Sequence, residues 1–290
     1  MSAKVLSDYA CHLGEGATYD PDTGTLYWFD IVEQKLLEKR MPDGDVVVHD
    51  LPFMASALAV IDAERQMILS ETGLHIRDVK SGALSLYAAI EADNPLTRSN
   101  DARVHPSGAF WFSTMGKGGG APALGAIYWH FRGEIRQLYT SVGIPNSICF
   151  SPDGAITYFV DTSNNRLMRV DCDPANGLPK GEPKLVLDAN GEEGGIDGSV
   201  CDADGMIWNA HWGKGCVNAY RPDGALLKSV TVPAKQSSCP VFLGKHAQHL
   251  ACTTAWQDLS TEQRKADPLA GQTFLLDVEV KGRFEPKIAL

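Results

Sequence analysis

The sequence predicts an all-β protein, a six-bladed β-propeller of four-stranded antiparallel blades around a central channel. Three observations favour this fold. One phrase of strand, turn and strand recurs six times, the copies are spaced at the period of propeller blades, and they take up nearly all of the 290 residues. The alternative is that strands separated by glycine-containing turns resemble one another by chance. Six copies in an ordered series make this explanation the weaker one.

Each copy of the phrase combines a short alternating strand, a turn and a second strand rich in aromatic and apolar residues. The copies occupy residues 15–31, 57–72, 100–115, 146–162, 197–212 and 239–255. The residues that open their turns lie 42, 43, 46, 51 and 42 positions apart. A sandwich or a barrel would show regular strands too, but neither needs one phrase six times.

A third strand follows the phrase in every copy, and turn signals separate one copy from the next. The expected third strands are residues 35–41, 74–79, 126–131, 166–171, 216–221 and 273–278. Two terminal segments could close the ring by pairing with the last blade, residues 3–6 and residues 284–290. Closure would remove an unpaired sheet edge. The sequence does not decide which of the two segments forms the closing strand.

Composition limits the classes of partner and compartment. The six copies leave no room for a second unit, so we expect residues 1–290 to form one domain. A net charge of −10 disfavours nucleic acid and anionic membrane surfaces as partners, since both are bound through clustered Lys and Arg. We expect no membrane span, and the N-terminus lacks the apolar region of a secretory signal, which indicates a cytoplasmic protein. The expected state is a monomer or a weak homo-oligomer.

The seven cysteines form no CxxC pair and show neither disulfide-framework nor zinc-ribbon spacing, so most are expected to be reduced. No GxSxG or HExxH motif is present, so neither serine-triad hydrolysis nor helix-borne zinc chemistry is supported.

Polar residues recur at one register of the repeat, five positions before each turn opens. The occupants are Glu15, Ala57, Asn100, Asn146, Asp197 and Cys239. Because the repeats are equivalent and strand residues alternate faces, these side chains should lie around one mouth of the channel. Each residue alone is also typical of a turn, but the shared offset favours a site.

Four of the six occupants offer oxygen ligands, two as carboxylates and two as amides, which is a donor set suited to a hard divalent cation. Without a cation, Glu15 and Asp197 would face each other in a partly desolvated space and raise each other's pKa. Arg98 lies two residues before Asn100, on the same side of an extended strand, and its guanidinium could hold a ligand carbonyl, hydroxyl or carboxylate. The alternative for Arg98 is an ordinary surface arginine.

At these residues the sequence resembles the SMP-30/gluconolactonase/regucalcin-like family of six-bladed propellers, which hydrolyse sugar lactones with a divalent metal. The resemblance rests on the segments LGEGATYD, RSNDARVHPSGAFWFSTM, GIPNSICFSPDG, GGIDGSVCDADGMIW and SSCPVF. It implies that Glu15, Asn146 and Asp197 bind the metal, that Arg98 and Asn100 bind substrate, and that Asp197 is also the general base.

One departure from the family concerns a substrate-binding glutamate that some members carry before the third-blade strand. That place falls near Gly120 and Ala121 in this chain, which leaves substrate orientation open.

The resulting hypothesis is metal-assisted opening of an aldonolactone, such as gluconolactone or a pentonolactone. The cation would polarise the lactone carbonyl, Asp197 would accept a proton from the attacking water, and Arg98 and Asn100 would orient the ring. Calcium, zinc, magnesium and manganese are all compatible with the donor set. Two alternatives remain, another metal-dependent ester or phosphotriester hydrolase and a non-catalytic calcium-binding propeller.

Overall fold

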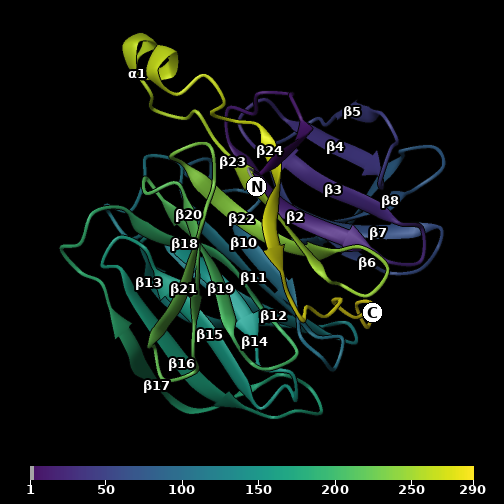
Figure 1. Ribbon diagram of the computed structural model, residues 1–290. Helices are drawn as coiled ribbons and strands as arrows, with labels where there is room; N and C mark the ends of the chain where they lie inside the picture. Colours follow the sequence, from purple (N-terminus) through teal and green to yellow (C-terminus); the bar gives the residue numbers. More distant parts are fainter. Residues whose placement is uncertain (1–2) are drawn as a thin grey trace.

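The computed structural model describes residues 3–290, which form six four-stranded sheets, and the predicted six-bladed propeller is confirmed (Figure 1). Neighbouring strands in the blades run antiparallel. The innermost strands of successive blades contact one another in ring order, and the last of them contacts the first. The channel is therefore bounded by six inner strands, each of which carries one copy of the repeated register.

The strands of the first three blades follow from the inner to the outer edge. They are β2 (Gly14–Asp20), β3 (Thr25–Asp30), β4 (Lys35–Arg40) and β5 (Val46–Asp50); β6 (Ala55–Val60), β7 (Arg65–Ser70), β8 (Gly73–Asp78) and β9 (Leu84–Ala89); β10 (Thr97–Val104), β11 (Phe110–Gly116), β12 (Gly125–Phe131) and β13 (Glu134–Val142). The third strand of each blade lies within a few residues of its predicted range.

The remaining three blades follow the same order. They are β14 (Pro145–Phe150), β15 (Ile156–Asp161), β16 (Arg166–Cys172) and β17 (Pro179–Asp188); β18 (Gly195–Cys201), β19 (Ile207–Trp212), β20 (Cys216–Tyr220) and β21 (Leu226–Thr231); β22 (Ser237–Leu243), β23 (His249–Thr254), β24 (Thr273–Glu279) and β1 (Lys4–Ser7). The sixth blade thus combines strands from both ends of the chain.

The N-terminal segment closes the ring. β1 pairs antiparallel with β24 as the outermost strand of the sixth blade, with Val5 opposite Phe274. Of the two terminal segments considered from the sequence, residues 3–6 therefore match the closing strand, and residues 284–290 do not enter a sheet. Pairing of the two chain ends satisfies an edge that would otherwise be exposed.

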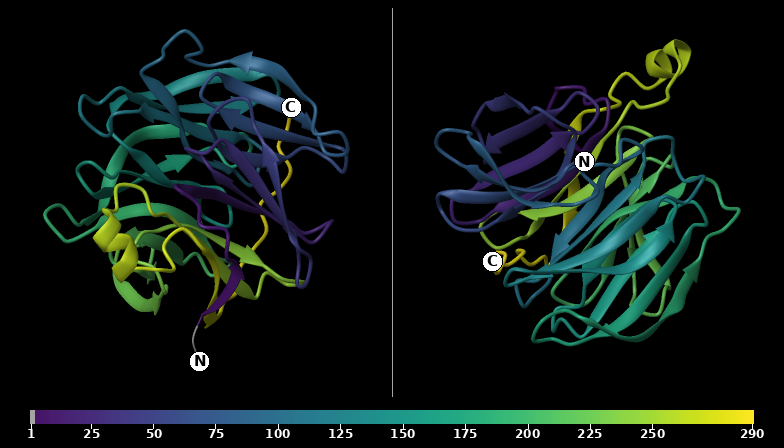
Figure 2. Two further views of the ribbon diagram at one scale, coloured as in Figure 1. Left: turned by 90° about the horizontal axis from the view of Figure 1, so that it is seen from above. Right: turned by 180° about the vertical axis from the view of Figure 1, so that it is seen from behind.

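The C-terminal segment, residues 280–290, runs across the face of the propeller away from the short helix (Figures 1 and 2). It forms hydrogen bonds or ion pairs with every blade. The partner residues, in blade order, are Asp22, Val60, Val104, Phe150, Cys201 and Ala247. The segment therefore covers this end of the channel and joins all six sheets.

A short helix, α1 (Thr261–Ala266), lies in the excursion between β23 and β24 and projects from the opposite face (Figure 1). Ser260 caps the helix and Gln263 completes a capping box, a signal that is present in the sequence. None of its residues is buried, and no helix among the described residues is long and apolar enough to cross a membrane.

The hydrophobic core lies between adjacent blades, with a separate cluster in each gap. Trp28 of the first blade packs with Val241 of the sixth, and Trp111 of the third blade packs with Phe150 and Phe159 of the fourth. The apolar second strands of the repeated phrase thus supply the contacts between sheets. All seven cysteines are free thiols, as expected.

Candidate active site

The five residues singled out from the sequence line one cavity of about 230 Å³. They are Glu15, Arg98, Asn100, Asn146 and Asp197. The residues at the same offset in the second and sixth blades, Ala57 and Cys239, are buried but do not line this cavity. Four inner strands, β2, β10, β14 and β18, therefore bring polar side chains together from positions up to 182 residues apart in the chain.

A register shift in each inner strand accompanies the site residue. The shifts fall between Glu15 and Thr18 in β2, between Asn146 and Cys149 in β14, and around Asp197 in β18. A β-bulge bends the strand and changes the direction of a side chain, which explains how several strands aim polar groups into one space.

Gly16, directly after Glu15, shows why the first strand needs a glycine. Its φ of +63° is in the left-handed region, and a Cβ there would lie 2.0 Å from the carbonyl oxygen of Ser56 in the next blade. A larger residue would push the two inner strands apart and move the Glu15 carboxylate.

The two carboxylates are buried and poorly compensated. Burial, together with the nearby Asp101 carboxylate, raises the pKa of Glu15, and burial together with Glu15 raises the pKa of Asp197 well above its ordinary range. The backbone N–H of Gly16 donates to Glu15 at 3.3 Å, and the N–H of Gly198 is the corresponding donor for Asp197. Because the two carboxylates lie close together and accept few hydrogen bonds, binding of a cation between them would be favourable.

A chain of hydrogen bonds sets the orientation of the two amides. The Asn146 Nδ2 donates to Thr162 Oγ1 at 3.1 Å, and that hydroxyl donates to the Ile196 carbonyl at 2.7 Å. The Asn100 Nδ2 donates to Asn146 Oδ1 at 2.7 Å. The Asn146 amide oxygen is thereby turned away from Thr162 and toward the other site residues.

Arg98 is a buried cation, only 9% exposed, and not a surface arginine. Its Nη1 donates to the Asn100 Oδ1 at 2.9 Å and to the Ser99 carbonyl at 2.8 Å. Burial lowers the pKa of Arg98 to about 10, against the opposing effect of Glu15 and Asp197, so it stays charged at neutral pH. Its remaining guanidinium donors are available to a ligand in the cavity.

The donor set fits a divalent cation, provided that amide oxygens take part. No cluster of three or more His, Cys, Asp and Glu side chains among residues 3–290 could hold a metal ion. Glu15 and Asp197 supply two carboxylates, and the oriented Asn146 supplies a third oxygen. Such mixed carboxylate and amide sites suit hard cations, with water completing the shell.

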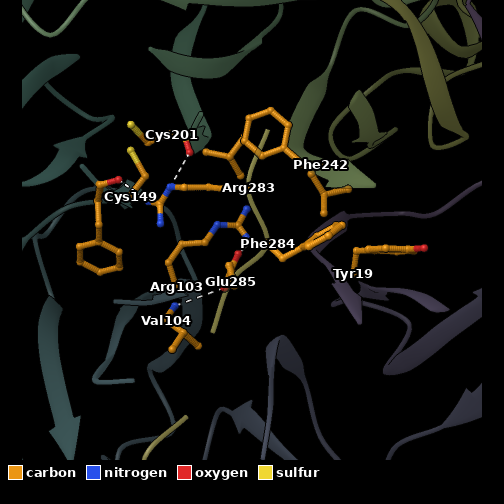
Figure 3. A pocket seen from close by; sticks show the side chains of 12 residues that line it. Tyr19, Arg103, Val104, Cys149, Cys201, Phe242, Arg283, Phe284 and Glu285 are labelled. Carbon is orange, nitrogen blue, oxygen red and sulfur yellow. Dashed lines mark hydrogen bonds and ion pairs between the residues drawn. The ribbon is translucent and has the colours of Figure 1, made fainter. Parts of the chain in front are cut away.

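The residues beneath the site were missed by the sequence analysis. Arg103 is buried in the channel, where its guanidinium donates to the carbonyls of Ala17 at 3.0 Å, Ser199 at 3.3 Å and Pro240 at 3.2 Å. It also pairs with Glu285 of the C-terminal segment at 3.1 Å (Figure 3). Arg103 therefore links the inner strands of four blades and ties down the segment that covers the channel.

Asp101, directly after Asn100, was not singled out from the sequence either. Its carboxylate accepts from the backbone N–H of Ile148 in the next blade at 2.8 Å and from that of Ala102 at 2.9 Å. Burial raises the pKa of Asp101 to about 6, against the lowering effect of Arg103. The hydrogen bond to Ile148 gives Asp101 a structural role, because it joins the third blade to the fourth.

Comparison with known proteins shows the family of this chain. The sequence profile of the SMP-30/Gluconolactonase/LRE-like region matches residues 13–256, a range that includes all five site residues. The chain belongs to this family.

Two relatives of this chain carry lactonase names. An L-arabinolactonase of Azospirillum brasilense is 32% identical over 99% of this chain and 95% of its own length. Pentonolactonase XacC of Haloferax volcanii is 31% identical over 98% and 97%. Both names describe hydrolases of a carboxylic ester bond, as the sequence had led us to expect for this chain.

Among solved structures, a calcium-binding protein, regucalcin, from Agrobacterium tumefaciens superposes with a TM-score of 0.98. It is 48% identical, and the match covers 100% of this chain and 98% of that one. The predicted resemblance to the SMP-30/gluconolactonase family is thus confirmed.

The loop at Gly120, where the resemblance led us to expect a departure from the family, packs closely against the next blade. A Cβ on Gly120 would lie 2.8 Å from the Ser163 Cβ and 3.2 Å from Ile144. The loop therefore contacts the next blade at this position, and Gly119, not a charged side chain, lines the cavity.

Proposed function

We propose that this protein hydrolyses a sugar-acid lactone to the open-chain acid and uses a divalent cation held by Glu15, Asn146 and Asp197. The observation that carries the proposal is the convergence of two buried, poorly compensated carboxylates with an oriented amide oxygen and a buried arginine in one cavity. The two lactonase relatives act on lactones of five-carbon sugar acids by name, so pentonolactones are the first substrates to test.

The cation would supply Lewis-acid polarisation of the lactone carbonyl and charge stabilisation as the ring opens. The side chains would provide proton transfer and substrate orientation. Asp197 would accept the proton of the attacking water, because it is a carboxylate that lines the cavity and accepts few hydrogen bonds from the protein. Arg98 and Asn100, joined by a hydrogen bond of 2.9 Å, orient the ring oxygens against that water.

Metal-stripped protein tests the proposal directly. We expect little hydrolysis of a panel of pentonolactones and hexonolactones without metal, and recovery when calcium, magnesium, manganese or zinc is returned singly. Aryl esters and phosphotriesters, assayed beside the lactones, should be turned over far more slowly. Full activity after metal removal would contradict the role of the cation. Turnover of aryl esters or phosphotriesters faster than that of lactones would favour the alternative of a metal-dependent ester or phosphotriester hydrolase.

A second candidate is a non-catalytic calcium-binding propeller, which the description of the Agrobacterium protein as calcium-binding favours. It predicts calcium binding by wild-type protein without hydrolysis of any lactone in the same panel.

A further inference from the structure

We infer that the blade-six turn formed by residues 256–258 is a recognition element for substrate hydroxyl groups, with Asp258 as the acceptor. The inference rests on the proposed lactone hydrolysis and concerns how the substrate is chosen. Gln257 and Asp258 line the same cavity as Glu15 and Asp197. Asp258 is the third carboxylate of that lining, and the other two belong to the candidate cation site.

The Asp258 carboxylate is free to bind a ligand. It forms no hydrogen bond or ion pair with any of residues 3–290, and it is exposed to solvent at the cavity rim. By contrast, other solvent-accessible acids already have partners, such as Glu33 with His12 and Glu71 with Lys117. An unpaired carboxylate can accept hydrogen bonds from neighbouring hydroxyl groups of a polyol.

The turn that carries Asp258 is held in place by its neighbours. The Trp256 ring lies between two groups, since the His12 ring stacks on it at 3.8 Å and 13° and the Arg264 guanidinium lies 3.9 Å from its centre. Two groups this close must occupy opposite faces of the ring. Trp256 Nε1 also donates to the Ala10 carbonyl at 3.1 Å, so the first residue of the turn is fixed on three sides.

The middle of the turn is equally constrained. The Gln257 carbonyl accepts from Gln236 Nε2 at 2.9 Å, and the Leu259 N–H donates to the Trp256 carbonyl at 3.1 Å. Asp258 itself has a φ of 59°, a left-handed backbone conformation that is unfavourable for a residue with a Cβ. The fold thus holds a carboxylate at a position where glycine would be less strained.

The opposite wall of the cavity offers no comparable acceptor. The third blade lies across the ring from the sixth and contributes Met115 and Gly119, while Ile144 comes from the turn before the fourth blade. Arg98 and the amides lie at the candidate cation site. Recognition of hydroxyl groups distant from the lactone carbonyl therefore falls to the turn that carries Asp258.

The test compares Asp258→Ala with wild type on a pentonolactone and on a set of monodeoxy lactones, each lacking one hydroxyl. We expect the variant to lose about ten-fold to a hundred-fold in kcat/KM for the parent lactone, mainly through KM, since a hydroxyl bound to a charged acceptor contributes on this scale. For the deoxy lactone that lacks the recognised hydroxyl, wild type and variant should be equally slow. Glu262→Ala is the matched control, because Glu262 lies in the same excursion but outside the cavity.

Three results would overturn the inference: equal losses on all lactones, no loss, or a weakened affinity for the divalent cation alone, measured by titration. The last would make Asp258 a cation ligand. Failure of the proposed function itself is distinguishable, because wild-type protein would then hydrolyse none of the parent lactones.

Discussion

Replacing Asp197 by asparagine is expected to lower kcat/KM for lactone hydrolysis by about a thousand-fold or more, because the change removes the proposed general base and one anionic ligand. The amide is nearly the same size and keeps one oxygen toward the cavity. The loss should appear in kcat with saturating cation present, and initial rates over a range of lactone concentrations measure it.

The Asp197→Asn variant should lose activity without losing stability. In metal-free protein, burial and the neighbouring Glu15 make the ionised Asp197 unfavourable, so a neutral side chain leaves the free energy of unfolding unchanged or raises it. Asp204→Asn, at an exposed turn of the same blade, is the control and should retain activity. A catalytically competent Asp197→Asn protein would refute the assigned role, and joint loss of activity and stability would indicate a structural one.

Replacing Arg103 by methionine is expected to reduce the free energy of unfolding by about 3 to 5 kcal/mol, the range for breaking a buried charged network. The change removes the donor for three buried carbonyls and leaves Glu285 without its partner. Chemical denaturation followed by tryptophan fluorescence measures the loss. Arg103→Lys should restore only part of it, because one ammonium cannot reach acceptors on several blades.

Arg221→Met provides the comparison for Arg103. Arg221 lies in an exposed turn, where solvent screens its pairing with Asp223, so its loss is expected to change the free energy of unfolding far less than the loss of Arg103. If the Arg103 and Arg221 variants were equally stable, Arg103 would not be the link between the blades that its contacts indicate.

The fold could be predicted from the sequence because the same pattern of strands and turns is repeated in every blade. Strand, turn and strand recur at one period, and the apolar core packs between adjacent blades. Local patterns were therefore enough to place the inner and third strands. The closing strand was different. Residues 3–6 and 284–290 both look like short strands, and only the packing of the whole ring shows that β1 pairs with β24.

The candidate site was predictable for a related reason, since a shared register brings Glu15, Asn100, Asn146 and Asp197 to the same cavity. Arg103 was not predicted, although it is the charged residue at its register position across the six copies. Its partners come from three other blades and the C-terminal segment, and no local pattern specifies such contacts. The turn of residues 256–258 lies outside the repeat altogether, so its place in the cavity depends on Trp256 packing.

The measurement that tests the central claim most directly is an anomalous diffraction map of crystals soaked with Mn²⁺. We predict one strong peak in the cavity, about 2.0 to 2.6 Å from oxygens of Glu15, Asn146 and Asp197, the range for hard divalent cations. An absent peak, or one held by other residues, would contradict the cation site on which the proposed chemistry depends.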